Sequence, residues 1–458
     1  MSSVSARLVS ALILPALASS SVACGADETS DAGGSDTGGG AEVGGHGGGD
    51  GGAPTCPEIP ERQWWELGME DYVLDSVVLH YLGQAYHQSA DVGEVLETAS
   101  RVDPAVSGSW MTEWQKTAQR LDAVANESEE AGHPLSASQA YLRAATYYRA
   151  ALHHQEDPYA PIVKELAEAE VTSFERYLAL SGSPCEPVSI PYEDTTLPGY
   201  FCRSPVAEEP APVLLFQEGR DAWAEDGKFI ADEAMKRGYH ALLFDGPGMA
   251  KVIRIEGLPF RHDWENVITP VIDFAVARPD VDASRIGLVS VSMGGYMGPR
   301  AAAFDHRLKV LVANPGVLDW SAIYEGFLDA IDPELLPLLD SDEGAFNERI
   351  EEYMQANELL AWGLVDSMWH HGVDTPAALM KELRKYTIAD VAGQITAHTL
   401  VVDAEAEEWG QSQALYDALT CPKDYLLFTA EEAAQFHVQP GAVGIASHRL
   451  FDWIDDAL

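Results

Sequence analysis

Basic side chains are scarce in this chain. Of its 458 residues, 28 are Lys or Arg and 73 are Asp or Glu, so the formal net charge is -45. A surface this acidic repels nucleic-acid phosphates and anionic lipid headgroups. A nucleic-acid partner is therefore excluded. A solvated acidic shell is the simplest interpretation of the charge, and attraction of cationic substrates is the alternative.

Long apolar runs are also missing. Beyond the N-terminus, no segment is long and apolar enough to span a membrane. Near the start, a short apolar stretch from Leu8 to Leu17 follows Arg7, the only charge before Cys24. This arrangement is typical of an export signal rather than of a membrane helix. We therefore predict a signal peptide over residues 1–23.

The residues after this stretch resemble a bacterial lipobox. In such signals the chain is cut before a cysteine that then carries lipid, and Ser21-Val22-Ala23-Cys24 places Cys24 there. Ser21 stands where Leu or a similar apolar residue is usual. The prediction is an exported lipoprotein of a bacterial cell envelope, in the periplasm or at the outer membrane, which meets the membrane only through lipid on Cys24. Cleavage near Ala23 without lipid is the alternative.

Cysteine is rare, with five in the chain. No CxxC pair or His/Cys spacing indicates a zinc site, so we expect neither a metal nor another cofactor. Cys185 and Cys202 flank a predicted hairpin from Val188 to Phe201, where a cross-strand disulfide is expected in an oxidising compartment. Cys56 and Cys421 either pair or stay free.

Composition divides the rest of the chain into three segments. Residues 24–60 are rich in Gly, Ser and Asp and nearly free of apolar side chains, which predicts a flexible tether. In residues 61–182, apolar side chains recur at three- and four-residue steps, as in Trp64–Val78 and Ala137–Leu152. This spacing indicates amphipathic helices, and so an N-terminal helical domain.

From residue 183 to 458 the pattern is that of an α/β domain. Short apolar runs alternate with helical stretches, which is typical of a mostly parallel, doubly wound sheet covered on both faces. The gap between residues 314 and 397 is too long for a simple crossover, so a helical lid is predicted over about 317–390. The expected strands lie at 213–216, 241–244, 286–289, 310–312, 399–402 and 425–428.

The segment Ser290-Val291-Ser292-Met293-Gly294-Gly295 lies between a predicted strand and a predicted helix. This is the context of a nucleophile elbow, in which a serine on a sharp turn exposes its hydroxyl. Gly294 and Gly295 supply the small neighbours that the turn needs, and Ser290 replaces the usual glycine on the other side. Ser292 is thus the predicted nucleophile, and the Met293 N–H at the helix start is a predicted oxyanion donor.

A serine hydroxyl needs a base to take its proton, and the base is expected late in the chain. His437 follows the last predicted strand by a short loop and is the predicted base. Other histidines are less well placed. His448 lies in a terminal helical pattern, and His370 and His371 lie in the predicted lid.

The acid partner of the base should follow the strand at 399–402. The fifth position after that strand is Glu407, with Glu408 as a close alternative and Asp403 as a weaker one. A carboxylate here would fix the imidazole tautomer. The loop after the strand at 213–216 contains Gly219, which lets the backbone approach a substrate, and we predict the Arg220 N–H as the second oxyanion donor.

Beyond the elbow, a set of further stretches carries a family resemblance: Ser136-Ala137, Tyr141–Ala144, Tyr147–Ala151, Thr196–Tyr200, Phe244–Gly248, Asp263–Glu265, Ser292–Tyr296, Pro299–Ala301, Ala313–Gly316 and Phe451–Trp453. Together they resemble the α/β hydrolases with an N-terminal helical domain, related to FrsA-like esterases. That group includes 2,6-dihydropseudooxynicotine hydrolase and the fungal hydrolases that shorten pigment polyketides. The resemblance covers roughly residues 103–455.

The resemblance implies a triad that maps onto Ser292, Glu407 and His437, with the helical domain packed over the active site. The chain departs from the family at Ser290, at Glu407, where Asp is usual, and in the residues before His437. The predicted function is a serine hydrolase that cleaves an ester, thioester or ketone-activated C–C bond of a small molecule through an acyl-enzyme. A peptidase and a non-catalytic ligand-binding lipoprotein are the alternatives, and a homodimer is left open.

Overall fold

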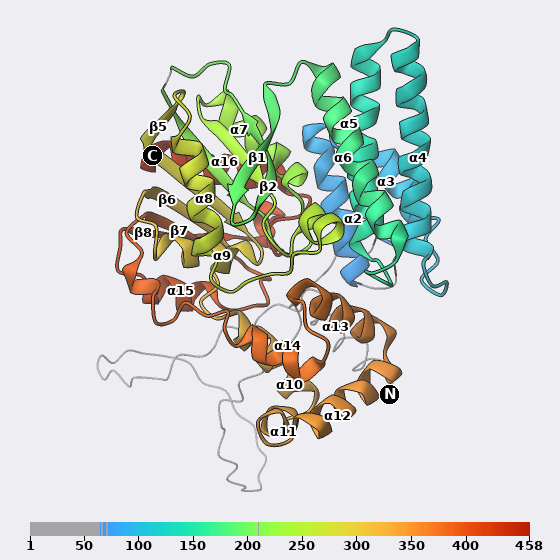
Figure 1. Ribbon diagram of the computed structural model, residues 1–458, viewed down its shortest axis with the longest axis vertical. Coiled ribbons are helices and arrows are strands. Elements are labelled where there is room, and N and C mark those ends of the chain that lie inside the picture. Colours follow the sequence, from blue (N-terminus) through green and yellow to red (C-terminus); the bar gives the residue numbers. More distant parts are fainter. Residues whose placement is uncertain (1–64, 66, 70–71, 209) are drawn as a thin grey trace, which may run out of the picture. The chain divides into compact units, whose positions relative to one another are not determined.

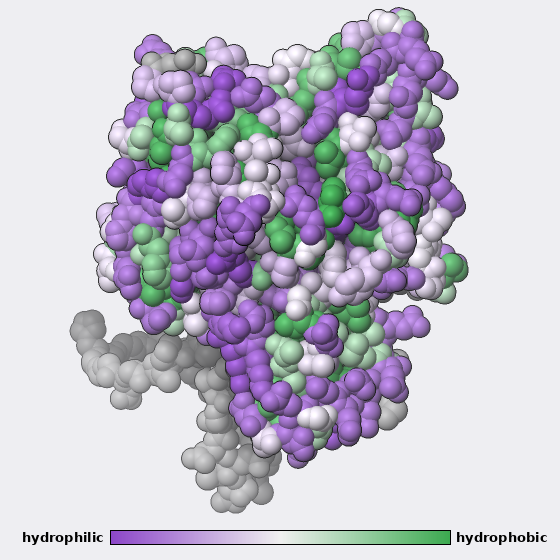
Figure 2. Space-filling model, in the orientation of Figure 1, coloured by the Kyte–Doolittle hydropathy of each residue, from purple (hydrophilic) through white to green (hydrophobic). Residues whose placement is uncertain are grey.

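The computed structural model describes residues 65, 67–69, 72–208 and 210–458, and these fall in one compact unit (Figure 1). The predicted signal peptide, the predicted tether, Cys24 and Cys56 therefore lie outside the described residues. None of the helices in the described part of the chain combines the length and apolar character needed to cross a membrane. Figure 2 shows hydrophilic side chains over most of the face in view, as expected for so acidic a chain.

An eight-stranded sheet lies at the centre of the unit, in the order β1-β2-β4-β3-β5-β6-β7-β8. β1 and β2 form an antiparallel hairpin, β2 is antiparallel to β4, and the remaining neighbours are parallel. Every residue of β3 and β4 is buried, because their continuous apolar runs are covered on both faces. The predicted α/β class is confirmed. The strands are β1 (Cys185–Tyr192), β2 (Thr195–Cys202), β3 (Ala211–Gln217), β4 (His240–Phe244), β5 (Val281–Val291), β6 (Leu308–Asn314), β7 (His398–Ala404) and β8 (Lys423–Phe428).

Helices cover both faces of this sheet. In Figure 1, α8 (Glu265–Val276) and α9 (Gly294–Ala302) lie in front of it, and α7 (Lys228–Lys236) and α16 (Val443–Ala457) lie behind it. The short helix α15 (Ser412–Ala418) follows β7. The hairpin at the sheet edge pairs Cys185 with Cys202 across its two strands, and a disulfide joins them. Among the described cysteines, Cys421 is free and half-buried.

The N-terminal helices stand beside the sheet (Figure 1). Nearly all of α5 is buried, because it lies between α4 and α6 and carries small apolar residues on several sides. Trp65 was predicted to share a helical period with later residues, but the first described helix begins at Tyr72. Gly68 adopts a φ of 93°, which a right-handed helix excludes. The helices are α2 (Tyr72–Gly83), α3 (Val92–Ala99), α4 (Ser109–Glu130), α5 (Pro134–His153) and α6 (Pro161–Ser181).

A buried arginine joins these helices to the α/β part of the molecule. Arg149 in α5 places Nη1 2.6 Å from Glu170 Oε1 in α6. Its Nε lies 2.9 Å from Asp226 Oδ1, in the segment that follows β3. All three side chains are almost completely buried, at 6% exposure or less. The helices and the loop after β3 are therefore joined by charges that have no access to water.

Five further helices form a lid between β6 and β7, as predicted. Where the lid leaves and rejoins the sheet, its two ends are paired: the Trp320 N–H donates to the Tyr386 carbonyl (2.9 Å) and the Ile388 N–H to the Leu318 carbonyl (3.0 Å). Four of the helices begin with a side chain that caps their free N–H groups, from Asp319, Asp342, Asn357 and Thr375. They are α10 (Trp320–Ile331), α11 (Leu335–Ser341), α12 (Glu343–Ala356), α13 (Glu358–His371) and α14 (Pro376–Leu383).

Candidate active site

Ser292 lies on the sharp turn between β5 and α9, with a φ of 56° that few residues other than glycine adopt. Its N–H donates to the Asn314 carbonyl at the end of β6 (2.7 Å), which fixes the turn against the neighbouring strand. A Cβ on Gly295 would lie 1.8 Å from the Pro315 carbonyl oxygen. The sequence therefore forms an elbow here because only glycine lets the strand and the helix approach this closely.

Ser290, the departure from the usual elbow glycine, is accommodated by a glycine on the facing helix α9. Its side chain is fully buried, and Oγ donates to the Val312 carbonyl (2.7 Å). A Cβ on Gly298 in α9 would lie 2.5 Å from this Oγ. The glycine that the elbow lacks before the nucleophile is thus replaced by one on the facing helix.

His437 lies between Ser292 and Glu407. Its Nε2 is 3.1 Å from Ser292 Oγ, and its Nδ1 is 2.8 Å from Glu407 Oε2. An ionised carboxylate only accepts hydrogen bonds, so Nδ1 carries the proton and Nε2 is left to accept from the serine hydroxyl. The three side chains thus form one continuous chain of hydrogen bonds at the carboxyl edge of the sheet.

The carboxylate that contacts His437 is that of Glu407, rather than Glu408 or Asp403. Its side chain is only 2% exposed. Its second oxygen, Oε1, accepts from the N–H groups of Glu408 (3.0 Å) and Trp409 (3.2 Å). Asp403 instead accepts from the hydroxyl of Tyr425. Backbone donors therefore fix the orientation of Glu407, and the loop leaves its other oxygen to the imidazole.

Trp409 covers the imidazole, a role that sequence reasoning missed. Its ring centroid lies 4.3 Å from that of His437. Trp320, the first residue of α10, packs edge-on against Trp409, with the centroids 4.9 Å apart. The only sequence signal was a tryptophan directly after the acidic loop. Both tryptophans are buried, so the pair places an apolar surface against the imidazole.

The loop after β3 passes directly beside the nucleophile. A Cβ on Gly219 would lie 2.8 Å from Ser292 Oγ and 3.3 Å from the Met293 nitrogen. Met293 is fully buried at the start of α9. The two predicted oxyanion donors, the N–H groups of Met293 and Arg220, therefore belong to the two backbone segments that meet at the serine hydroxyl.

The Arg220 side chain belongs to a buried ion cluster. Asp221, Asp366 and His370 are the described residues whose potential ligand atoms lie close enough together for a metal ion, within 4.8 Å. Arg220 Nε, however, lies 3.1 Å from Asp221 Oδ1, and its Nη2 lies 3.7 Å from Asp366 Oδ2. The guanidinium thus supplies the positive charge that a metal would bring. We assign the cluster to ion pairing, with His370 Nδ1 donating to the Gly248 carbonyl (2.7 Å).

The other histidines considered from the sequence lie away from the triad. His371 Nδ1 contacts the Tyr386 hydroxyl (3.1 Å), and burial lowers the pKa of His371 well below its usual value. His448 lies in α16, as the sequence indicated. His370 and His371 thus pack the base of the lid and do not contact Ser292.

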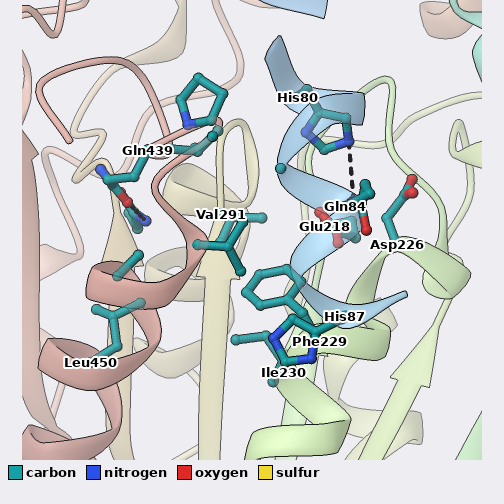
Figure 3. Close-up of a pocket in the computed structure, with 17 residues that line it drawn as sticks. His80, Gln84, His87, Glu218, Asp226, Phe229, Ile230, Val291, Gln439 and Leu450 are labelled. Atoms are coloured by element: carbon teal, nitrogen blue, oxygen red, sulfur yellow. Dashed lines mark hydrogen bonds between the residues drawn. The ribbon is translucent and has the colours of Figure 1, made fainter. Parts of the chain in front are cut away.

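A cavity of about 80 Å³ is lined in part by chain neighbours of Ser292 and His437. Figure 3 shows Glu218, Val291 and Gln439 around it, and each adjoins a part of the site: Glu218 precedes Gly219, Val291 precedes Ser292, and Gln439 follows His437 by two residues. Burial raises the pKa of Glu218 well above its usual value, and the carboxylates of Asp226 and Asp245 raise it further. The folded protein therefore favours the protonated form of Glu218.

An amide pair beside this cavity joins the elbow to the histidine loop. Asn314 Nδ2 donates to Gln439 Oε1 (2.8 Å), and both side chains are buried. Gln439 and its neighbour Val438 both have a positive φ, 54° and 52°. No sequence pattern indicates this pair, because it depends on a strand end and a loop that are 125 residues apart.

Hydrolases of several fungi are similar to this chain. No family model matches the chain. "Hydrolase LUC6" of Fusarium is 31% identical over 401 residues, covering 82% of this chain and 94% of that protein. "20-hydroxy-prefusarin hydrolase FUS2" of Gibberella moniliformis is 30% identical over 400 residues, covering 82% and 94%. "Alpha/beta hydrolase psoB" of Aspergillus fumigatus is 29% identical over 416 residues, covering 83% and 92%.

Solved structures share the fold. The crystal structure of 2,6-dihydroxy-pseudo-oxynicotine hydrolase aligns with a TM-score of 0.63 and 17% identity, covering 82% of this chain and 95% of that one. Wild-type AbyA5 aligns with a TM-score of 0.56 and 18% identity, covering 84% and 94%. The predicted resemblance to hydrolases of this group is confirmed.

The prediction of a lipid-anchored protein of a bacterial cell envelope is wrong. LUC6, FUS2 and psoB are all hydrolases of fungi. That prediction depended on a short apolar stretch and four residues ending at Cys24, a pattern too brief to be specific. Neither lipid on Cys24 nor an envelope location is retained.

Proposed function

This chain belongs to the α/β-hydrolase family and is a hydrolase, and from that premise we propose that it is a serine hydrolase with Ser292 as its nucleophile. The substrate is a small molecule with an ester, a thioester or a C–C bond beside a ketone. The observation that carries the proposal is the hydrogen-bonded chain from Ser292 Oγ through His437 to Glu407, at 3.1 and 2.8 Å.

Ser292, His437 and Glu407 have distinct roles in the proposed reaction. His437 Nε2 takes the proton of Ser292 as Oγ attacks the substrate carbonyl, and Glu407 stabilises the imidazolium that forms. The N–H groups of Met293 and Arg220 bind the oxyanion. His437 then returns the proton to the leaving group, which leaves an acyl-enzyme. A water molecule, deprotonated by the same imidazole, releases the acid and restores the Ser292 hydroxyl.

A catalytic role is favoured over a binding protein that has lost turnover. Ser290 was the departure that most weakened the elbow, and Gly298 leaves room for it. Glu407 in place of Asp is compatible with the imidazole, because two backbone N–H groups hold its far oxygen and aim the longer side chain. The departures from the family therefore leave each step of the mechanism with its required group.

Labelling of Ser292 tests the nucleophile. We expect a fluorophosphonate probe to add one adduct to the folded protein, and Ser292→Ala to lose the adduct together with roughly 10⁴-fold or more of the activity on an activated ester. Ser341→Ala is the matched control, since its hydroxyl donates within α11, to the Pro337 and Leu338 carbonyls. Intact-mass analysis that finds no adduct on the wild-type protein would contradict the proposal.

A pair of neighbouring substitutions tests the acid. Glu407→Gln keeps the shape of the side chain but removes the charge that stabilises the imidazolium, so kcat should fall by about 10³- to 10⁴-fold. Glu408→Gln should lose far less. Measuring both kcat values under the same conditions decides between the two carboxylates, and a larger loss for Glu408→Gln would reverse the assignment.

A further inference from the structure

The side chain of Arg220 is held mainly by the lid. Its Nη1 donates to Ser367 Oγ in α13 (2.9 Å) and to the Tyr324 hydroxyl in α10 (3.3 Å). Its Nη2 lies 3.7 Å from Asp366 Oδ2, also in α13. Asp221, the next residue in the chain, is a partner outside the lid. The side chain is 5% exposed, so these contacts orient a guanidinium that solvent does not reach.

One face of α10 reaches both sides of the proposed catalytic centre. Trp320 and Tyr324 are one helical turn apart and lie on the same face. Trp320 packs on Trp409, which covers His437, while Tyr324 contacts Arg220. In Figure 1, α10, α13 and α14 lie together, below the sheet and the N-terminal helices. The same helix thus contacts the base side and the oxyanion side of the site.

Recognition of an anionic substrate does not explain this arrangement of Arg220. The guanidinium already has two carboxylates and two hydroxyls around it, and it is buried. A buried arginine with complete partners is a structural anchor for its own backbone. The backbone it anchors follows Gly219, whose Cα faces the Ser292 hydroxyl.

We propose that Arg220 is a positioning residue through which the lid assembles the oxyanion hole. Ser367 and Tyr324 fix the guanidinium, the guanidinium fixes the backbone at Arg220, and the N–H of that residue is held where the oxyanion forms. The proposal rests on the proposed serine-hydrolase function. It adds to that function that catalysis depends on α10 and α13 being packed against the loop that contains Arg220. A lid that is unseated leaves Ser292 and His437 in place but loses one oxyanion donor.

The proposal predicts a loss in kcat with little change in KM. The oxyanion exists only in the transition state and the tetrahedral intermediate, so a misplaced donor does not weaken binding of the ground state. Complete loss of such a donor costs roughly 100- to 1000-fold in kcat. We expect Ser367→Ala and Tyr324→Phe each to cost about tenfold in kcat, because each removes one of the two hydroxyl anchors.

Matched controls within the lid separate this role from general damage. Ser341→Ala and Tyr353→Phe make the same chemical changes at hydroxyls that bond only within the lid, to the Pro337 carbonyl and to Asp332. Both should keep kcat within about twofold. The inhibition constant of an alkyl boronic acid, which forms a tetrahedral adduct on serine, should rise in Ser367→Ala and Tyr324→Phe by the same factor as kcat falls.

A double-mutant cycle tests whether the hydroxyls act through Arg220. Arg220→Lys keeps the charge beside Asp221 and Asp366, but a single ammonium cannot span both lid hydroxyls and a carboxylate. In the Arg220→Lys background, Ser367→Ala should cause no further loss of kcat, because the anchor is already gone. Independent, multiplicative losses would overturn the proposal, as would an unchanged kcat in Ser367→Ala and Tyr324→Phe.

The outcome also distinguishes this proposal from the function on which it rests. If the wild-type protein takes no fluorophosphonate adduct, the serine-hydrolase function fails and the lid variants are irrelevant. If every variant is labelled and its melting temperature falls only slightly, the nucleophile stands, and the kcat values alone decide the role of Arg220. Lost labelling in Ser367→Ala with an unchanged melting temperature would also contradict the proposal, since Ser292 and His437 should remain in place.

Discussion

The N-terminal helices and the lid hold opposite ends of the same loop by different chemistry. The segment after β3 begins at Glu218 and reaches Gly227 before α7. At its far end, Asp226 pairs with Arg149 of α5, and both side chains are sealed from water. At its near end, Arg220 donates to two neutral hydroxyls of the lid, and its ion pair with Asp366 of α13 is longer, at 3.7 Å. The N-terminal helices therefore bind the loop through a close buried ion pair, and the lid binds it mainly through hydrogen bonds to hydroxyls.

This difference predicts that the two sets of contacts affect stability and catalysis to different degrees. Breaking a buried ion pair by removing one partner costs about 3–5 kcal/mol, because the remaining charge stays buried without compensation. Losing one hydrogen bond between uncharged and charged groups costs about 1–3 kcal/mol. The N-terminal helices should therefore determine whether the domain is folded, and the lid should determine how fast the folded enzyme works.

The largest expected effect is on the Arg149 side. Arg149→Met keeps most of the side-chain length but leaves Glu170 and Asp226 buried without their partner. We expect the free energy of unfolding to fall by about 3–5 kcal/mol. Denaturant titration followed by circular dichroism measures this directly, and the fraction that remains folded should still take the fluorophosphonate label.

Arg143→Met is the matched control on the same helix. Arg143 pairs with Glu94, but both side chains are partly exposed, at 24% and 18%. Pairs of this kind contribute about 1 kcal/mol or less. If Arg143→Met and Arg149→Met lowered the free energy of unfolding equally, the buried ion pairs of Arg149 would stabilise the fold no more than a partly exposed pair does.

A smaller effect is expected at Glu218, the first residue of the loop after β3. Its carboxyl has a raised pKa in the folded state, so folding favours the protonated form. The stability that this group contributes is complete below its unfolded pKa and is lost as the pH rises toward its folded pKa. Glu218→Gln, a neutral isostere, should raise the melting temperature at pH 8 and leave it nearly unchanged at pH 4.

Melting curves from pH 4 to 8 check this sign. The exposed Glu175 of α6 offers a control, since Glu175→Gln should move the melting temperature little at any pH. Asp245 will keep part of the dependence in Glu218→Gln, because burial raises its pKa to about 7. A Glu218→Gln protein that is less stable than wild type at pH 8 would mean that the carboxylate is charged and paired.

Local patterns in the sequence were sufficient for the strands, the lid and the elbow. The apolar runs of β3, β4 and β7 are continuous because both faces of the sheet are covered, so they stand out from the helices around them. Counting from the end of β7 selected Glu407, and the structure places that carboxylate on His437. Distances along the chain were enough here because each residue follows its own strand by a short loop.

Contacts between distant segments gave no such signal. The fit of Ser290 depends on Gly298, the cover of His437 depends on Trp320 of the lid, and the setting of Arg220 depends on Ser367. Each involves a pair of positions that no local period connects. The N-terminal pattern around Cys24 failed for the opposite reason, because a short motif was interpreted without any tertiary context.

The smallest expected effect is on the stability of the lid variant, and it is the sharpest test of the comparison. Ser367→Ala removes one hydrogen bond from Arg220, which keeps Tyr324, Asp221 and Asp366 as partners. The free energy of unfolding should therefore fall by only about 1 kcal/mol, well below the loss in Arg149→Met, although kcat falls by about tenfold. Thermal melts and kcat measured on the same preparations give both quantities. A Ser367→Ala protein as unstable as Arg149→Met would show that the lid stabilises the fold. The contacts of the loop with the lid would then be structural, like its contacts with the N-terminal helices, rather than catalytic.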